Sequence, residues 1–147
     1  MTDSRAGRVL GVDLGSRRVG LALSDPSRTI ASPLDVLQRP KVAADLYAAI
    51  RARAVEHEAV LVVVGLPLSL DGSDGPAARA ARSEGAAMGE AFGAELPVVL
   101  YDERLTTITA QRSLEAAGVR GRAQTPVVDK VAAAVMLQAF LDGGARR

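Results

Sequence analysis

The amino-acid sequence predicts an α/β protein built on one mixed five-stranded sheet, an antiparallel hairpin plus parallel strands, with helices on both faces. Residues 8–14 and 19–24 have the pattern of two strands joined by the tight turn "GSRR", which is typical of an antiparallel hairpin. The apolar run over residues 60–64, in which every residue but Leu61 is β-branched, is typical of a strand buried on both faces, as in a parallel sheet. Helical and strand patterns then alternate, and this order places helices over the faces of the sheet.

The remaining elements follow from apolar spacing and turn residues. A short strand is predicted over residues 30–37. Leu46, Ile50 and Ala54 recur at helical spacing after Pro40 and predict a helix over residues 41–58. After the run over residues 60–64 and the Gly-rich loop that follows it, the sequence predicts a helix over 76–92 and a strand over 97–101. A helix over 106–117, closed by Gly118, and a last helix from 126 to about 141 follow.

The second strand of the hairpin has two different faces. Val19, Leu21 and Leu23 alternate with three small residues, Gly20, Ala22 and Ser24. Side chains alternate between the two faces of a sheet, so one face is bulky and the other is small. We expect another part of the chain to approach the small face closely.

Composition limits the classes of protein that need to be considered. The chain has 147 residues, so we expect one domain over residues 1–147, with at most seven N-terminal and about five C-terminal residues flexible. Its 48% hydrophobic and 24% charged residues are typical of a soluble globular protein. Its apolar runs are far shorter than the ~20 residues of a membrane span, and no signal-peptide pattern begins the chain. We therefore expect a cytoplasmic protein that does not bind membranes.

Two classes of site are excluded or disfavoured by residue type. The chain contains no cysteine, so it has no disulfide and no thiolate zinc site, and oxygen atoms with one histidine remain as metal ligands. That histidine, His57, lies at the polar end of a predicted helix in "VEHEA", which is a poor match to a Ser-His-Asp arrangement. A formal net charge of +1 also argues against a strongly basic protein that binds nucleic acid by charge alone.

Three acidic residues are placed to point inward. Asp13 lies within the first apolar strand, where an ionised carboxylate costs several kcal/mol unless a cation or hydrogen-bond donors compensate it. Glu103 follows the strand "PVVLY" near its carboxyl end, where ligands bind in open α/β sheets. Asp129 lies in the first turn of the last helix, on the apolar stripe that should face the sheet.

The three carboxylates allow two interpretations. If they converge, their repulsion raises their pKa values unless a divalent cation lies among them, and Mg²⁺ or Mn²⁺ suits a set of oxygen ligands. Taken one at a time, each acid can instead be neutralised locally. The local partners would be Arg17 or Arg18 for Asp13, Arg104 for Glu103, and the helix N-terminus for Asp129.

Cationic residues near these acids are candidates for contact with the phosphates of a nucleic acid. The guanidinium group is a planar fork that matches phosphate, and such contacts make binding weaken with salt. The alternative is that these residues form a solvated charged surface. The candidates are Arg17 and Arg18 in the hairpin turn, Arg104 after Glu103, Arg120 and Arg122 in "GVRGRAQTP", and Lys130 beside Asp129.

Four strings occur in an order that resembles a known family. "GVDLGSRRVGLALSD", "VVVGLPLSLDG", "YDERLTT" and "VVDKVAAAVML" are similar to motifs of the YqgF/RuvX family of bacterial ribonuclease H-like proteins, and the resemblance covers roughly residues 8–141. The resemblance implies a ribonuclease H-like fold and places Asp13, Glu103 and Asp129 at the family's catalytic, metal-binding acidic triad. Lys130 departs from the small residue that relatives commonly carry after the last acid.

The resemblance also implies a function. The expected enzyme is a Mg²⁺- or Mn²⁺-dependent nuclease, a hydrolase of phosphodiester bonds that processes the 5′ end of pre-16S rRNA in ribosome biogenesis. Resolution of Holliday junctions in branched DNA is the alternative. The expected partners are therefore pre-rRNA, with ribosomal precursor particles, or branched DNA, bound by a monomer or a homodimer.

Two functions from other classes remain open. "GVDLGS" also resembles the first phosphate motif of the actin, sugar-kinase and Hsp70 superfamily, which would indicate an ATP-binding phosphotransferase-like domain. Those proteins clasp ATP between two such domains, and this chain has room for one. A non-catalytic RNA-binding factor is the other possibility. ATP affinity would favour the first, and RNA binding without cleavage would favour the second.

Overall fold

The computed structural model describes residues 7–69, 71–103 and 126–144. Its strands are β1 (Arg8–Leu14), β2 (Arg18–Ser24), β3 (Ala31–Gln38), β4 (Ala59–Leu66) and β5 (Val98–Asp102). They form one sheet in the order β3-β2-β1-β4-β5. The pairs β1–β2 and β2–β3 are antiparallel, and the pairs β1–β4 and β4–β5 are parallel. The predicted mixed five-stranded sheet is confirmed.

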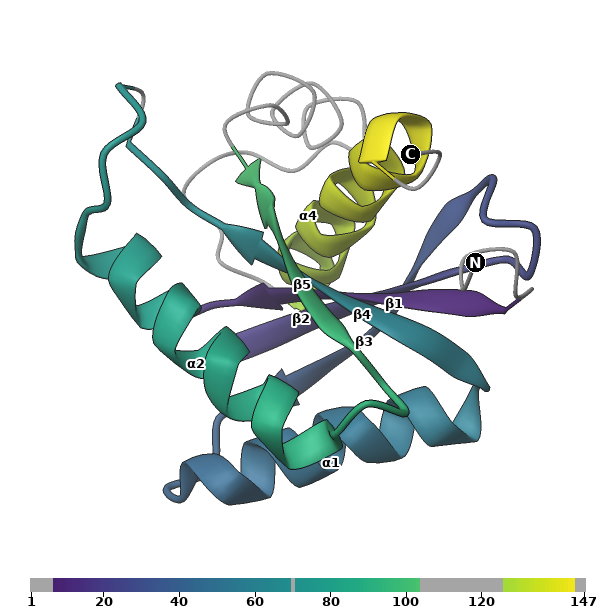
Figure 1. Ribbon diagram of the computed structural model, residues 1–147, viewed down its shortest axis with the longest axis horizontal. Helices are drawn as coiled ribbons and strands as arrows, with labels where there is room; N and C mark the ends of the chain where they lie inside the picture. Colours follow the sequence, from purple (N-terminus) through teal and green to yellow (C-terminus); the bar gives the residue numbers. More distant parts are fainter. Residues whose placement is uncertain (1–6, 70, 104–125, 145–147) are drawn as a thin grey trace.

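Three helices cover the two faces of this sheet (Figure 1). Helices α1 (Ala43–Glu56) and α2 (Pro76–Phe92) lie on one face, and α4 (Pro126–Ala139), followed by the short π-helical turn η3 (Phe140–Gly144), lies on the other. Helix α1 is shorter than the predicted 41–58, because Glu58 adopts a φ of 60° that cannot continue a right-handed helix. The predicted helix over 106–117 lies outside the described residues.

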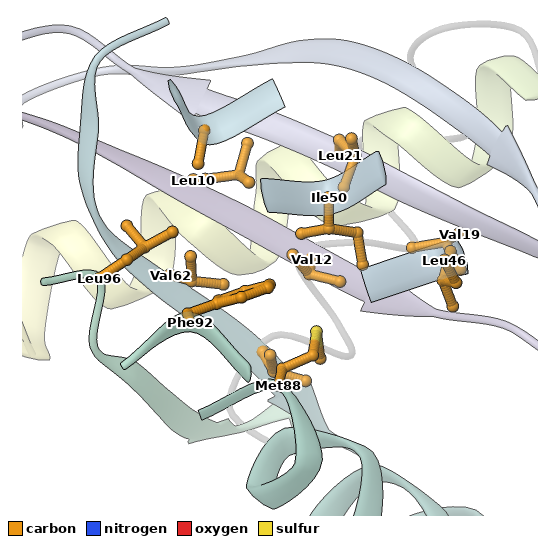
Figure 2. Packing of buried hydrophobic residues seen from close by; sticks show 12 residues of the cluster. Leu10, Val12, Val19, Leu21, Leu46, Ile50, Val62, Met88, Phe92 and Leu96 are labelled. Atoms are coloured by element: carbon orange, nitrogen blue, oxygen red, sulfur yellow. The ribbon is translucent and has the colours of Figure 1, made fainter. Parts of the chain in front are cut away.

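The core beneath α1 and α2 consists of large side chains (Figure 2). Leu10 and Val12 of β1 pack there against Ile50 of α1 and against Met88 and Phe92 of α2. All five side chains are almost entirely buried. Fully burying a side chain of this size contributes roughly 1.5–3 kcal/mol to folding, so this face supplies much of the stability.

In the core beneath α4, the residues that the strands contribute are smaller. Ala133 and Leu137 of α4 pack there against Val9 of β1 and Ala22 of β2. A Cβ atom added at Gly11 of β1 would lie 3.0 Å from the Leu137 side chain, which is tighter than normal packing. Helix α4 therefore lies close to the sheet.

None of the helices in the described part of the chain has the length and apolarity required to span a membrane.

Candidate active site

The candidate site lies at the edge of the sheet where the parallel strands end. Because β1, β4 and β5 run parallel, their carboxyl ends meet at this edge, and β2 begins there because it is antiparallel to β1. Asp13 is the second-last residue of β1, and Glu103 directly follows β5. Asp129 lies in the first turn of α4, which packs against β2. The topology thus brings three acids that are far apart in sequence to one edge of the sheet.

The small face of β2 is what admits Asp129 to this edge. A Cβ atom at Gly20 would overlap with the backbone carbonyl oxygen of Asp129, so the first turn of α4 lies directly on the strand. The predicted close approach to the small face of β2 is therefore confirmed. The approaching part of the chain is the turn of α4 that carries the third acid.

Asp13 and Glu103 are in direct contact, and a glycine between them makes the contact possible. Their side chains form a hydrogen bond with each other. Strand β4 lies between β1 and β5, and a Cβ atom at Gly65 of β4 would overlap with the Glu103 carboxylate. Glu103 therefore reaches across Gly65 to Asp13. Any side chain at residue 65 would occupy the space through which Glu103 reaches.

Burial and mutual repulsion perturb this carboxyl pair. Burial, followed by the charge of Asp129, raises the pKa of Asp13 to about 6, against the lowering effect of the hydrogen bond with Glu103. Burial, followed by the charge of Asp13, raises the pKa of Glu103 to about 7. The pair therefore retains a proton near neutral pH, and a cation among its oxygens would replace that proton.

Asp129 has a different partner. Its Oδ2 accepts a hydrogen bond from Nε of Arg18 at 2.7 Å, and both side chains are about one-fifth to one-quarter exposed. Asp129 lies at a helix N-terminus, as the local interpretation expects, and the structure adds a guanidinium group as its partner. For Asp13, neither Arg17 nor Arg18 is the neutralising partner that local pairing would predict; its hydrogen-bonding partner is Glu103.

The residues present have the chemistry of a magnesium or manganese site without its full geometry. All the donors are carboxylate oxygens, which are the ligands that both ions prefer. Within the described residues, no three acidic or histidine side chains are grouped closely enough to hold one metal ion. Asp13 and Glu103 are brought together as predicted, and the carboxylate of Asp129 is bonded to Arg18 instead of joining them.

A hollow of about 440 Å³ opens beside this site. It is lined by Gly15, Ser16, Arg17, Arg18 and Asp129. The volume lies within the ~300–1,000 Å³ range of small-ligand pockets. Arg17 and Ser16 of the hairpin turn are exposed to solvent at its rim. Arginine side chains and an acid at the site therefore share one open surface.

The other predicted contacts have different outcomes. The charge of Lys130 helps to lower the pKa of Asp35 in β3, after the larger effects of Arg53 and Val36, and the phosphate contact of Lys130 stays a prediction. Arg104, Arg120 and Arg122 lie outside the described residues.

Sequence reasoning missed the role of one glycine. Gly65 directly follows the run over residues 60–64, to which the sequence pattern assigns only a buried strand, yet it provides the space that Glu103 crosses. A glycine directly after a run of residues typical of buried strands was the available signal, because glycine in a strand often marks a close approach.

Comparisons with known proteins identify a matching family and similar proteins. Residues 7–143 match the model of one family, which is described as "RuvX: Holliday junction resolvase". A protein from Mycobacterium sp. (strain KMS), named "Putative pre-16S rRNA nuclease", is 44% identical over 140 residues, which cover 95% of this chain and 82% of the relative. A protein of the same name from Kineococcus radiotolerans is 50% identical over 139 residues, which cover 94% of this chain and 73% of the relative.

Solved structures show the same fold at low sequence identity. The structure titled "T. thermophilus RuvC in complex with Holliday junction substrate" superposes with a TM-score of 0.54 at 17% identity and covers 95% of this chain and 97% of that one. A second structure of the same protein gives a TM-score of 0.50 at 18% identity and covers 94% and 97% of the two chains. The ribonuclease H-like fold implied by the sequence motifs is thereby confirmed.

Proposed function

The chain belongs to the RuvX family, and on this premise we propose that it is a divalent-metal-dependent nuclease that matures the 5′ end of pre-16S rRNA. The names of its relatives from Mycobacterium and Kineococcus support the substrate. The proposed place of action is the cytoplasm, on free pre-rRNA or on ribosomal precursor particles.

One observation carries this proposal: a half-buried carboxyl pair, Asp13 and Glu103, lies at the carboxyl ends of parallel strands beside an arginine-lined hollow. A purely structural role would leave two half-buried acids destabilising each other without a compensating gain. Perturbed acids in a cleft are instead typical of a site that binds a cation or transfers protons.

We assign the metal to Asp13, Glu103 and Asp129. An ion bound there would supply positive charge to the scissile phosphate and lower the pKa of an attacking water. The protein itself fixes the position of the carboxylates: Gly65 gives Glu103 access to Asp13, and Gly20 lets α4 bring Asp129 to the same edge. In the structure, Arg18 forms an ion pair with Asp129.

We assign substrate binding to the cations around the hollow. Arg17 is exposed at the rim, and Arg18 lies inside it beside Asp129. Arg104, Arg120, Arg122 and Lys130 are the further candidates. Because these groups would contact phosphates and not bases, binding should weaken with salt and depend little on base sequence.

The test is cleavage of a 5′-labelled pre-16S rRNA fragment by the full chain, with Mn²⁺ or Mg²⁺ and with EDTA. Wild-type protein should cut only with the metal, and Asp13→Asn should lower the rate at least 100-fold because a buried ligand is lost. Asp45→Asn is the matched control, since Asp45 is an exposed acid in the first turn of α1, on the opposite face of the sheet. Full metal-dependent cleavage by Asp13→Asn would refute the assignment.

A second candidate function, resolution of Holliday junctions, is favoured by the description of the family. The same assay with a four-way DNA junction and a linear duplex of equal length distinguishes the two functions. Symmetric cuts in the junction, together with a dimeric mass in solution, would favour resolution. Binding of RNA without cleavage would indicate a non-catalytic RNA-binding factor, and affinity for ATP would indicate a phosphotransferase-like domain.

A further inference from the structure

The hairpin turn between β1 and β2 is held from outside the sheet by a single arginine. Arg39 directly follows β3, and its backbone N–H donates to the carbonyl oxygen of Arg17 at 2.9 Å. Its side-chain Nε donates to the carbonyl oxygen of Gly15 at 2.7 Å. The two bonds reach both ends of the three-residue turn, so Arg39 fixes the turn through backbone atoms whose positions do not depend on side-chain rotamers.

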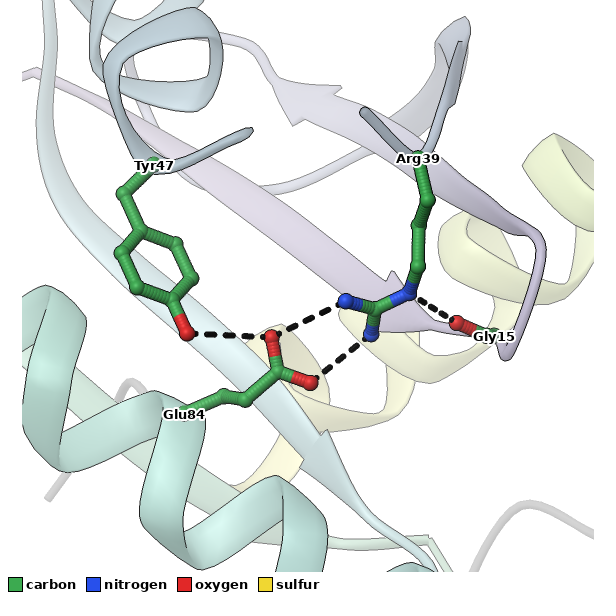
Figure 3. A network of polar contacts seen from close by, with 4 residues as sticks. All are labelled: Gly15, Arg39, Tyr47 and Glu84. Carbon is green, nitrogen blue, oxygen red and sulfur yellow. Dashed lines mark hydrogen bonds and ion pairs between the residues drawn. The ribbon is translucent and has the colours of Figure 1, made fainter. Parts of the chain in front are cut away.

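The other end of the Arg39 guanidinium is anchored to the helices (Figure 3). Its two terminal nitrogens donate to the two carboxylate oxygens of Glu84 on α2, at 3.2 and 2.8 Å. The Tyr47 hydroxyl of α1 donates to Oε1 of the same carboxylate at 3.2 Å. Arg39 and Glu84 are both mostly buried. The guanidinium therefore connects the turn to both helices on the opposite side of the sheet from α4.

We propose that Arg39, anchored by Glu84, is a positioning residue that holds the β1–β2 turn in place for binding nucleic acid. The planar guanidinium donates in two directions at once, toward Gly15 and toward Glu84. A lysine would provide one point charge, which cannot keep both the fork to the carboxylate and the bond to the turn. The inference rests on the proposed function, because the turn matters for binding only if Arg17 and Arg18 meet the substrate.

The position of the turn bears directly on the candidate site. Gly15, Ser16, Arg17 and Arg18 make up most of the lining of the hollow. Arg18 also holds Asp129. A second hollow of about 150 Å³, lined in part by Gly15, Ser16, Arg39 and Glu84, lies on the helix side of the turn. The turn is therefore not packed tightly against the helices on this side, and Arg39 is the side chain that bridges it to Glu84 of α2.

The proposal is tested with Arg39→Lys in two measurements. The first is amide hydrogen exchange of Gly15, whose N–H donates across the turn to Arg18 at 3.0 Å. Arg39→Lys keeps the backbone bond to Arg17 but loses the side-chain bond to Gly15, and this loss should raise the exchange rate of the Gly15 amide at least tenfold, with the amide of Val63 in β4 unchanged. The second is the Kd for a fluorescein-labelled pre-16S rRNA fragment, which should rise at least fivefold.

A double-mutant cycle separates positioning from general destabilisation. Arg17→Ala removes a proposed phosphate contact of the turn, and we expect Arg39→Lys to weaken binding less in that background than in the wild type. Two independent defects would instead multiply. Glu84→Gln should also speed Gly15 exchange and raise the Kd, but by less than Arg39→Lys does. The reason is that the amide oxygen of glutamine can still accept hydrogen bonds from Tyr47 and Arg39.

Arg53→Lys is the matched control. Arg53 of α1 also makes a two-nitrogen contact with an acid, Asp35 of β3, at 3.0 and 2.7 Å, and these bonds anchor it to β3 and not to the turn. It should leave Gly15 exchange and the Kd unchanged. Thermal unfolding checks that each variant is folded.

Unchanged Gly15 exchange in Arg39→Lys, or multiplicative effects in the cycle, would overturn the positioning role. If the wild-type protein binds no nucleic acid, the proposed function fails, and the exchange measurement still decides whether Arg39 holds the turn.

Discussion

The two faces of the sheet are built from residues of different size. Beneath α1 and α2, large side chains such as Leu10 and Phe92 fill the space between the sheet and the helices. Beneath α4, the strands present Gly11 and Gly20, and a Cβ atom at either position would press on α4. The large-residue face buries apolar area, and the small-residue face allows backbone to approach backbone.

This difference explains why all three acids gather on one face. Asp13 alternates with Leu10 and Val12 along β1 and so points toward α4. Large side chains on that face would keep the first turn of α4, with Asp129, away from Asp13. The face under α1 and α2 therefore supplies most of the stability, and the face under α4 carries the candidate site. Substitutions on one face should change one property and leave the other largely unchanged.

The largest effect on stability is expected on the large-residue face. Phe92→Ala removes a ring that is almost completely buried between α2 and the sheet, and should lower the free energy of unfolding by about 3–5 kcal/mol. Cleavage per folded molecule should remain, because this face carries none of the three acids. Urea unfolding and the rRNA assay measure the two quantities. If the fully folded Phe92→Ala variant lost cleavage, the two faces of the sheet would not control stability and cleavage independently.

A smaller effect is expected from pH on the small-residue face. In the folded protein, the pKa values of Asp13 and Glu103 are raised to about 6 and 7, so both bind protons more tightly than in the unfolded chain. Their contribution to stability is therefore fully present below about pH 4 and is lost as the pH rises toward 7. At about 1.4 kcal/mol per pKa unit, the loss is on the order of 3 kcal/mol for each of the two carboxyl groups.

Urea unfolding at pH 4.5 and pH 8 in metal-free buffer measures this loss. Asp13→Asn should reduce it, because one of the two buried charges is gone. Mn²⁺ at pH 8 should raise the free energy of unfolding of the wild type, and it should raise that of Asp13→Asn much less. The assignment of Asp13 and Glu103 as a perturbed pair would be contradicted if the free energy of unfolding of the wild type rose from pH 4.5 to pH 8 while that of Asp13→Asn did not.

The smallest effect on stability is expected from Gly65→Ala. The added methyl group would meet only the carboxylate end of Glu103, which is flexible and can move aside, so the free energy of unfolding should change by less than about 1 kcal/mol. The hydrogen bond with Asp13 should be lost, and we expect at least a tenfold fall in metal-dependent cleavage.

Gly20→Ala is the contrasting variant for this experiment. Its methyl group would meet the backbone of Asp129, which cannot move without displacing α4, so about 1–3 kcal/mol of stability should be lost as well as cleavage. Equal stability losses in the two glycine variants would show that Glu103 is held as rigidly as the helix backbone.

Much of the framework could be predicted from local patterns. The alternation of Val19 and Leu21 with Gly20 predicted a small face, and the helical stripe that begins at Asp129 predicted the side of α4 that meets it. Both patterns depend on contacts that repeat every two residues or every turn, so neighbours in the sequence are sufficient to reveal them. The order of the elements likewise predicted the mixed sheet.

The partners of the charged groups could not be predicted in this way. Arg18 and Asp129 are 111 residues apart, and Arg39 and Glu84 are 45 apart. Arg18 was expected to neutralise a neighbour such as Asp13, yet it binds the acid that α4 delivers from the end of the chain. Pairing of this kind depends on which strands are adjacent and on how closely a helix sits on them.

The sequence by itself therefore determined the faces of each strand and helix, and with them the inward direction of Asp13 and Asp129. Only the tertiary structure decided that Glu103 crosses Gly65 to Asp13, that Arg18 neutralises Asp129, and that Arg39 secures the turn from the helix side. The physical reason is that side-chain periodicity is a local property of the backbone, whereas the distance between charges is set by the packing of segments that are far apart along the chain.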